Sequence, residues 1–194
     1  GQAADYEGCI NIKNEVTDAG APKASMVYWV TGAEAACAVN RSVLNKVYDG
    51  EFHPDVSLTQ AQLVAAIQAG EMAFHNVGQE VRVLNDSNSL VTLSDTKGEV
   101  FQDNQTIRVI DQIANDIANL FNTKYLGVVP NDESGRISLW ADIIKHHEQL
   151  QDIRAIQDFS EEDVTVSQGD SKKSVVVDDY ITVTNAMAIL YMTV

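Results

Sequence analysis

The sequence predicts a fold that combines helices and strands (α/β, in the broad sense of mixed α+β). Helices are expected to pack on a mixed sheet, which the C-terminal strands complete. Three patterns predict it. Apolar residues recur at three- and four-residue steps over residues 104–124, as on one face of a helix. A second helical stripe follows over residues 137–153. Valines at even spacing between residues 159 and 183 are typical of strands.

The first hundred residues predict short strands and two helices. Strands are expected over Tyr6–Ile12 and Val43–Tyr48, and a helix is expected from Pro22 to about Val39 because proline suits the first helical turn. The clearest helix signal is Thr59–Ala69, which has a capping box at its start and a glycine directly after its end. A hairpin is expected next, with strands Met72–Phe74 and Val81–Leu84 around the turn His75–Gly78.

The second half predicts two long helices followed by strands. We expect a domain boundary that divides the chain into residues 1–93 and residues 94–194. The first long helix carries Ile113 and Ile117 on an apolar face that should be buried. Pro130–Gly135 separates it from the second helix. The strands that follow place apolar residues at even spacing: Val164, Val166, Val175, Val177, Ile181 and Val183.

The composition is that of a globular protein with an acidic surface. Of the 194 residues, 45% are hydrophobic and 21% are charged, which is ordinary for a folded chain. The 28 acids and 13 bases leave a net charge of −15, which repels phosphate backbones and anionic lipid. We therefore expect neither nucleic acid nor a membrane as a partner. We also expect no leader and no membrane span in this sequence.

The sequence carries no motif of an enzyme or a metal site. It lacks a GxSxG elbow, a phosphate-binding loop and a GxGxxG turn, and Gln151 stands where an HExxH site needs its second histidine. His146 and His147 are adjacent, so a helix would point them in different directions. Cys9 and Cys37 are too few for a zinc site or a disulfide framework and are expected to be free thiols. We expect no catalytic residue, no cofactor and no metal.

Two other functions stay open on the residues alone. The densest acidic run holds four carboxylates between Asp158 and Asp163, and a hydrolase would need two of them held close so that one pKa rises. Such a run is usually a solvated loop. The other alternative is an acidic module that binds a small ligand or a protein, which an enclosed pocket with converging polar groups would favour.

The C-terminus is the most informative segment. From Tyr180 to Val194 the chain carries no charge and is rich in β-formers. Apolar side chains near its end fall on both faces of a strand, which must then be covered on both faces and paired or protected at its edge. Two interpretations stay open. Leu190–Val194 is either a central strand of the chain's own sheet or an arm that pairs with a neighbouring subunit by β-augmentation.

Long stretches of the sequence resemble contractile phage tail sheath proteins. Residues Ile107–Phe159, which read IRVIDQIANDIANLFNTKYLGVVPNDESGRISLWADIIKHHEQLQDIRAIQDF, are similar to the C-terminal domain of that family. The likeness is strongest to sheaths of defective prophages and phage-tail-like bacteriocins of Gram-positive bacteria. The resemblance continues in shorter segments, which are YEGCINI at 6–12, WVTGA at 29–33, NSLVT at 88–92, DVTV at 163–166, SVVV at 174–177 and LYMTV at 190–194.

The resemblance implies a structural subunit that polymerises around a tail tube and contracts to drive that tube through a cell envelope, without catalytic residues or cofactor. The expected partners are copies of itself in a helical or ring-stacked homo-oligomer, a tail tube protein and a baseplate. The expected location is a virion or phage tail-like particle assembled in the bacterial cytoplasm. Because family members exchange terminal strand arms, the subunit-interface candidates are Val175, Val177, Ile181, Val183, Ile189, Leu190, Tyr191, Met192 and Val194.

In length, the chain departs from the family it resembles. A sheath subunit carries an N-terminal portion, including one arm, before the equivalent of Gly1, and it usually runs a few residues past the equivalent of Val194. We therefore expect this chain to be a fragment of something longer, with both arms incomplete.

Overall fold

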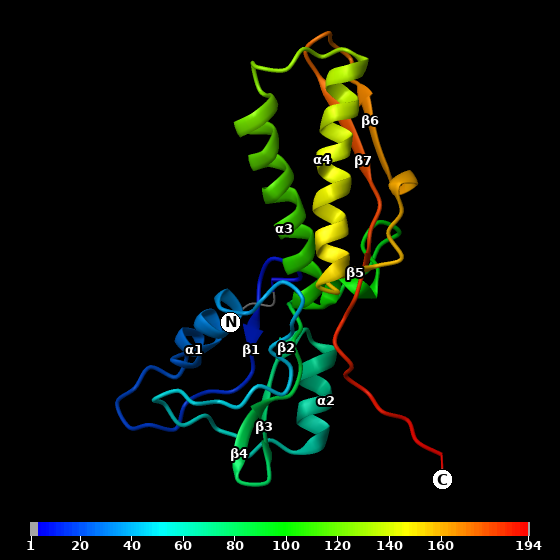
Figure 1. The fold of residues 1–194 in the computed structure, drawn as a ribbon. Helices are drawn as coiled ribbons and strands as arrows, with labels where there is room; N and C mark the ends of the chain where they lie inside the picture. The colour runs from blue at the N-terminus through cyan, green and yellow to red at the C-terminus, as the bar shows by residue number, and fades with distance from the viewer. Residues whose placement is uncertain (1–3, 194) are drawn as a thin grey trace. The chain divides into compact units, whose positions relative to one another are not determined.

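The computed structural model describes residues 4–193, which divide into two compact units that are described separately (Figure 1). The first unit contains the chain up to Ile107 and the segment that begins at Ala186, and the second contains Arg108–Asn185. Both units combine helices with small sheets, so the expected mixed α+β class is confirmed. The expectation of one mixed sheet is wrong for the described residues, because their strands form four separate two-stranded sheets.

The first unit holds short strands, two α-helices and a 3-10 helix in its described residues. Its helices are α1 (Met26–Ala35), α2 (Gln60–Gln68) and a 3-10 helix (Glu99–Gln102). Its strands are β1 (Asn11–Ile12), β2 (Glu71–Met72), β3 (Phe74–Val77) and β4 (Glu80–Val83). β1 pairs in parallel with β2, and β3 pairs antiparallel with β4. The expected hairpin is therefore confirmed, although its turn falls later than expected, at Gly78.

Helix α2 forms where the capping signals predict it. The Thr59 hydroxyl accepts a hydrogen bond from the Gln62 amide at 3.4 Å, and the Thr59 amide donates to the Gln62 side-chain oxygen at 2.8 Å. Gly70 follows the helix with φ +68°, a conformation that glycine adopts without strain. A Cβ there would also approach the Ser89 backbone to 3.0 Å. Local capping therefore sets the start of this helix, while at its end both the left-handed backbone and the nearby Ser89 backbone favour glycine.

Three expectations in the first unit need correction. The first helix begins at Met26 rather than Pro22, because the Ser25 amide and hydroxyl both donate to the Pro22 carbonyl and close a turn first. The expected strand Val43–Tyr48 is interrupted at Asn45, where φ is +61°. Only an isolated bridge from Val47 to β4 remains in that stretch. The expected first strand shortens to β1, the part that has a partner in β2.

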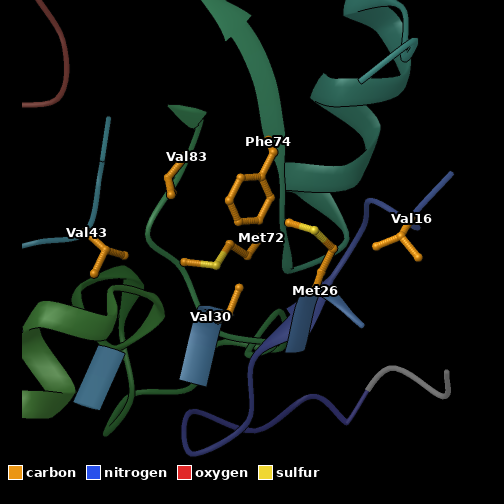
Figure 2. Packing of buried hydrophobic residues seen from close by; sticks show 7 residues of the cluster. All are labelled: Val16, Met26, Val30, Val43, Met72, Phe74 and Val83. Atoms are coloured by element: carbon orange, nitrogen blue, oxygen red, sulfur yellow. The ribbon is translucent and has the colours of Figure 1, made fainter. Parts of the chain in front are cut away.

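The core of the first unit gathers around Phe74, which is fully buried (Figure 2). Trp29 and Tyr48 pack against its ring, with centroid distances of 5.6 and 5.9 Å. Burial raises the pKa of the Tyr48 hydroxyl. Asn14 is also buried, and it bonds both the amide and the carbonyl of Phe74. The buried apolar residues of this cluster are Val16, Met26, Val30, Val43, Met72, Phe74 and Val83.

The second unit is built on two long helices and a β-hairpin. Its helices are α3 (Asn104–Leu120), whose first turn belongs to the first unit, a π-helix (Phe121–Tyr125), α4 (Glu133–Asp152) and a 3-10 helix (Glu161–Asp163). Its strands are β5 (Ile156–Gln157), β6 (Val164–Gln168), β7 (Val175–Asp179) and β8 (Thr182–Val183). Both predicted long helices are confirmed. β5 pairs with β8 and β6 with β7, each antiparallel.

The β6–β7 hairpin packs beside α4 (Figure 1). Trp140 of α4 ties the two together, because its indole N–H donates to the Val164 carbonyl at 3.0 Å. α4 begins where the Asp132 side chain accepts a bond from the Gly135 amide at 2.8 Å. The buried apolar residues of this core are Tyr125, Leu139, Ile143, Ile144 and Val164.

Candidate functional site

Strand β7 has one strand partner among the described residues, β6, so its other edge is open. The Tyr180 amide bonds the Asp163 carbonyl, and the Gly169 amide bonds the Ser174 carbonyl. These two bonds mark the hydrogen-bonded pairs of the ladder, which alternate with non-hydrogen-bonded pairs in an antiparallel sheet. By that alternation, the backbone amides and carbonyls of β7 that point away from β6 are those of Val175, Val177 and Asp179.

The same three residues turn their side chains toward the helices. Val175, Val177 and Asp179 are half-buried, whereas Val176 and Asp178 between them are exposed. An apolar hollow of about 230 Å³ lies at this point, lined only by carbon-rich side chains. Its walls come from the end of α3 and the start of the π-helix, from α4 and from β7, and they are Ile117, Ala118, Phe121, Leu139, Val175 and Val177.

This hollow shares part of its lining with a smaller one toward the tip of the hairpin. The smaller hollow, of about 90 Å³, shares Phe121, Leu139 and Val175 with the first and has Arg136 and Lys173 on its rim. Together the two hollows form an apolar trough beside the open edge of β7. A strand that paired with this edge would therefore bring every second side chain into an apolar site.

The other end of β7 carries a buried polar pair. The His147 side chain is fully buried, and its Nε2 lies 3.0 Å from Asp179 Oδ2. This distance is in the range of an ion pair, yet neither His147 Nε2 nor Asp179 Oδ1 has a hydrogen-bond partner among the described residues. His147 Nδ1 lies 2.9 Å from the Ile143 carbonyl, which can only accept. Nδ1 therefore carries a proton. The Phe159 ring packs against the imidazole, with 4.9 Å between the two ring centroids.

Two carboxylates hold α3, the π-helix and α4 together. Asp116 accepts from Gln112 at 2.7 Å and lies 2.9 Å from His146 Nε2. Partial burial acts to raise the pKa of Asp116, but hydrogen bonds from Gln112 and His146 outweigh it and hold the pKa below its ordinary value. Asp142 accepts from Lys124 and from the Tyr125 hydroxyl, and these bonds likewise outweigh burial and lower its pKa. Burial and the Asp142 charge raise the pKa of Tyr125.

The C-terminal segment is extended and exposed. Residues 184–193 form no helix or strand, so the expected strand over Leu190–Val194 is wrong for its described part, and Val194 lies outside the described residues. Its large apolar side chains face solvent: Met187 is 99% exposed, Leu190 85% and Tyr191 90%. The physical reason is that a strand with two apolar faces forms only against a partner edge. The interface candidates Ile189 and Met192 are exposed in the same way.

The remaining interface candidates lie just before this segment. Val183 belongs to β8 and pairs with Ile156, while Ile181 is half-buried and outside any strand. Among the described residues, the interface candidates thus fall into two groups. The first group lies in or next to β7 and β8, and it consists of Val175, Val177, Ile181 and Val183. The second lies along the exposed terminal segment, and it consists of Ile189, Leu190, Tyr191 and Met192.

The His147–Asp179 pair and the apolar trough were not predicted from the sequence. The alternation that singled out Val175 and Val177 also places Asp179 on the same face, so that signal was present. His147 was not predicted as a partner because helical spacing does not reveal which strand packs against it. His146 and His147 do point in different directions, as expected, toward Asp116 and Asp179 respectively.

The acidic run and the two cysteines do not form a chemical centre in the described part of the chain. Asp158 and Glu161 are exposed, and Asp163 accepts from the Ser160 amide at 2.8 Å as a local cap. Cys9 and Cys37 are half-buried and are not joined in a disulfide. Within residues 4–193 no three His, Cys, Asp or Glu side chains come together in a way that could hold a metal ion. No helix in the described part of the chain is long and apolar enough to cross a bilayer.

A hollow of about 550 Å³ lies along β1, and it bears on the small-ligand alternative. Its rim carries charges, but they neutralise one another: Lys13 lies 3.1 Å from Glu71, and Lys23 lies 2.6 Å from Glu15. Because each of its four charged lining residues already has an opposite partner, the hollow offers no unpaired charge to a small ligand.

Open strand edges, apolar troughs and an uncharged extended segment are features of a structural protein that associates with other chains. Comparison with known proteins identifies the family. Residues 1–89 match the phage tail sheath protein central domain, and residues 96–194 match the phage tail sheath C-terminal domain. The chain belongs to the phage tail sheath family, whose members are structural rather than enzymatic. The expected family and the expectation of a structural protein are therefore confirmed.

Relatives from Gram-positive bacteria bear out the stated likeness. The phage-like element PBSX protein XkdK of Bacillus subtilis is 31% identical over 91% of this chain and 40% of its own length. The sheath tail protein of Desulfitobacterium hafniense is 36% identical, with a TM-score of 0.83 over 93% of this chain and 43% of that one. The sheath tail protein of Listeria innocua is 30% identical, with a TM-score of 0.84 over 93% of this chain and 44% of that one.

More distant structures share the fold alone. The helical sheath of the anti-feeding prophage in its contracted state is 15% identical, with a TM-score of 0.71 over 96% of this chain and 55% of that one. This chain spans about 40% of the length of the curated Bacillus relatives that it matches.

Proposed function

We propose that this chain forms the joining part of a contractile tail sheath subunit, which polymerises around a tail tube and contracts to drive the tube through a cell envelope. The observation that carries the proposal is the open edge of β7 beside an apolar trough, in a chain that also exposes an uncharged, strand-forming segment. The open edge offers unpaired backbone groups, and the extended segment has the composition of a strand but no strand partner among the described residues. Their chemistry is complementary.

In this proposal, residues 187–193 of one copy pair with the edge of β7 on another copy. Backbone hydrogen bonds to Val175, Val177 and Asp179 supply the affinity, and alternate side chains enter the trough. Ile181 and Val183 lie in the connection that leads from β7 to the donor segment. The eight interface candidates within the described residues then divide into acceptor, connection and donor.

A strand linkage suits an assembly that changes shape. The exchanged strand keeps its hydrogen bonds while the chain on either side rotates, so neighbouring subunits stay joined during contraction. The energy of contraction would be stored in the extended lattice, because a rearrangement of packed subunits needs no bound nucleotide. The further proposed partners are the tail tube protein and the baseplate, with no role for nucleic acid or membrane.

The proposed location is a phage tail or tail-like particle that is assembled in the bacterial cytoplasm. We also keep the domain boundary after residue 93 as a proposal. It is supported by the two family matches, which end at residue 89 and resume at residue 96.

Deletion of the donor segment tests the proposal. In the full-length protein, removal of the chain from Leu190 onward should abolish tubular polymers in electron micrographs, because the open edge then lacks its strand. The described residues of this segment are exposed, so circular dichroism and the melting temperature should stay unchanged. A second variant, Val177→Pro, removes an amide from the open edge without touching the donor and should also block assembly. If the truncated protein is folded and still forms normal sheaths, this segment is not the joint.

A further inference from the structure

The buried pair at the end of β7 has an unmet hydrogen-bonding requirement. Asp179 Oδ1 is buried and has no hydrogen-bond partner among the described residues, and neither has His147 Nε2. Buried polar groups are satisfied in the great majority of folded proteins, and one left unsatisfied is costly. Asp179 is also one of the three residues whose backbone groups face the open edge. Its side chain therefore lies within reach of a strand that docks there.

We infer that Asp179 and His147 set the register of the incoming strand by pairing with the hydroxyl of Tyr191 from another copy of the chain. This inference rests on the proposed strand exchange and names the contact that specifies it. A hydroxyl both donates and accepts, so one group can donate to Asp179 Oδ1 and accept from a protonated His147 Nε2. Of residues 187–193, only Tyr191 and Thr193 carry such a group.

The apolar trough decides between these two hydroxyls. Side chains on one face of a strand are two residues apart. If Thr193 lay at Asp179 in a parallel strand, Tyr191 would lie at Val177 and bury its hydroxyl in a hollow that is lined only by apolar side chains. If Tyr191 lies at Asp179, Ile189 lies at Val177 and Met187 lies at Val175. The second register buries aliphatic groups in the hollow and places the hydroxyl at the polar pair.

The direction of the strand follows from the same matching. In an antiparallel alignment with Tyr191 at Asp179, Thr193 rather than Ile189 would lie at Val177 and bury its hydroxyl in the apolar hollow. The parallel alignment places Ile189 and Met187 along the hollow instead. Parallel strands need a connection of about a dozen residues or more, whereas only residues 180–186 separate β7 from Met187. The donor strand therefore comes from a second copy.

Disulfide trapping of the full chain tests this register. In a background with Cys9→Ala and Cys37→Ala, the pair Val177→Cys with Ile189→Cys should form covalent dimers and longer species on a non-reducing gel. Neighbouring strands bring Cα atoms within disulfide range. The control pair Val177→Cys with Leu190→Cys places the second thiol on the opposite face and should cross-link far less. The pair Val177→Cys with Tyr191→Cys reports the register in which Thr193 lies at Asp179.

The hydroxyl contact has its own readout. Tyr191→Phe should weaken self-association of the full chain about tenfold in sedimentation, as expected for loss of a hydrogen bond to a charged group. Asp179→Asn should weaken it similarly, and the double variant should be no weaker than either single one. Thermal melts of each variant separate this effect from unfolding.

The outcomes distinguish the two ideas. Preferred cross-linking of the Tyr191→Cys pair, or additive effects of Tyr191→Phe and Asp179→Asn, would overturn the register while leaving strand exchange in place. If no pair cross-links and Val177→Pro leaves association unchanged, strand exchange itself is wrong, and the register contact fails with it.

Discussion

The pair of long helices and the C-terminal segment differ in how their backbones are satisfied. α3 and α4 bond their own amides and carbonyls, so each forms as soon as one face is buried. The segment over residues 187–193 is at least as apolar, yet its described residues form no strand and remain exposed. A helix completes its hydrogen bonds within four residues, whereas a strand depends on another strand. The segment is therefore a structural element that lacks its partner.

The largest expected effect is a loss of stability when a buried side chain of α3 is shortened. Ile113→Ala should lower the free energy of unfolding of the second unit by about 2–5 kcal/mol, because Ile113 is buried in the described structure and truncation leaves a cavity. Ile117→Ala should cost less, since Ile117 is half-buried and lines the open trough. Urea unfolding followed by Trp140 fluorescence in a Trp29→Phe background would isolate the second unit.

The matched control for this series is Asn119→Ala, which changes an exposed side chain on the same helix. It should alter stability by less than about 0.5 kcal/mol. A loss below 1 kcal/mol for Ile113→Ala would mean that the buried face of α3 has been misassigned.

A smaller effect is expected from acid. The pKa values of Asp116 and Asp142 are lowered in the folded chain from an ordinary value of 3.8. A lowered carboxyl pKa stabilises the fold above that value, and the contribution is lost as the pH falls through the folded pKa. The second unit should therefore be less stable at pH 3 than at pH 7. Asp142→Asn should reduce this difference, because the variant cannot titrate at that position.

Matched urea titrations at the two pH values would measure the acid effect. The exposed Asp111→Asn is the control, since Asp111 lies on the solvent side of α3 and should leave the pH dependence unchanged. Equal stability at both pH values in the unsubstituted chain would show that these carboxylates do not stabilise the folded state.

The smallest expected effect is on the melting temperature when a side chain of the C-terminal segment is shortened. Leu190→Ala should leave the melting temperature of this chain unchanged within error, because the Leu190 side chain is 85% exposed. The matched core variant Ile156→Ala removes a side chain that is 1% exposed and should destabilise clearly. If Leu190→Ala lowered the melting temperature as much as Ile156→Ala, the segment would be packed within its own chain rather than available to another.

Local signals predicted most helices well and strands poorly. The capping box at Thr59 and the glycine at position 70 bound α2 as expected, because both act through neighbouring residues. Val43–Tyr48 has the composition of a strand, but the left-handed backbone at Asn45 interrupts it. No pattern of apolar residues reports such a turn. The trough beside β7 was also beyond prediction, because its walls come from α3, α4 and β7, which are far apart in the sequence.

The sequence by itself determined the helices, the uncharged C-terminal segment and membership of the phage tail sheath family, since each depends on residues that are close together in the chain. Only the tertiary structure decided that Val175, Val177 and Asp179 face an open edge, and that His147 lies against Asp179. Those facts depend on which strand pairs with which and on the face that each helix turns inward. A strand makes its hydrogen bonds with the strand edge that lies beside it. In the described part of this chain, residues 187–193 are paired with no strand edge.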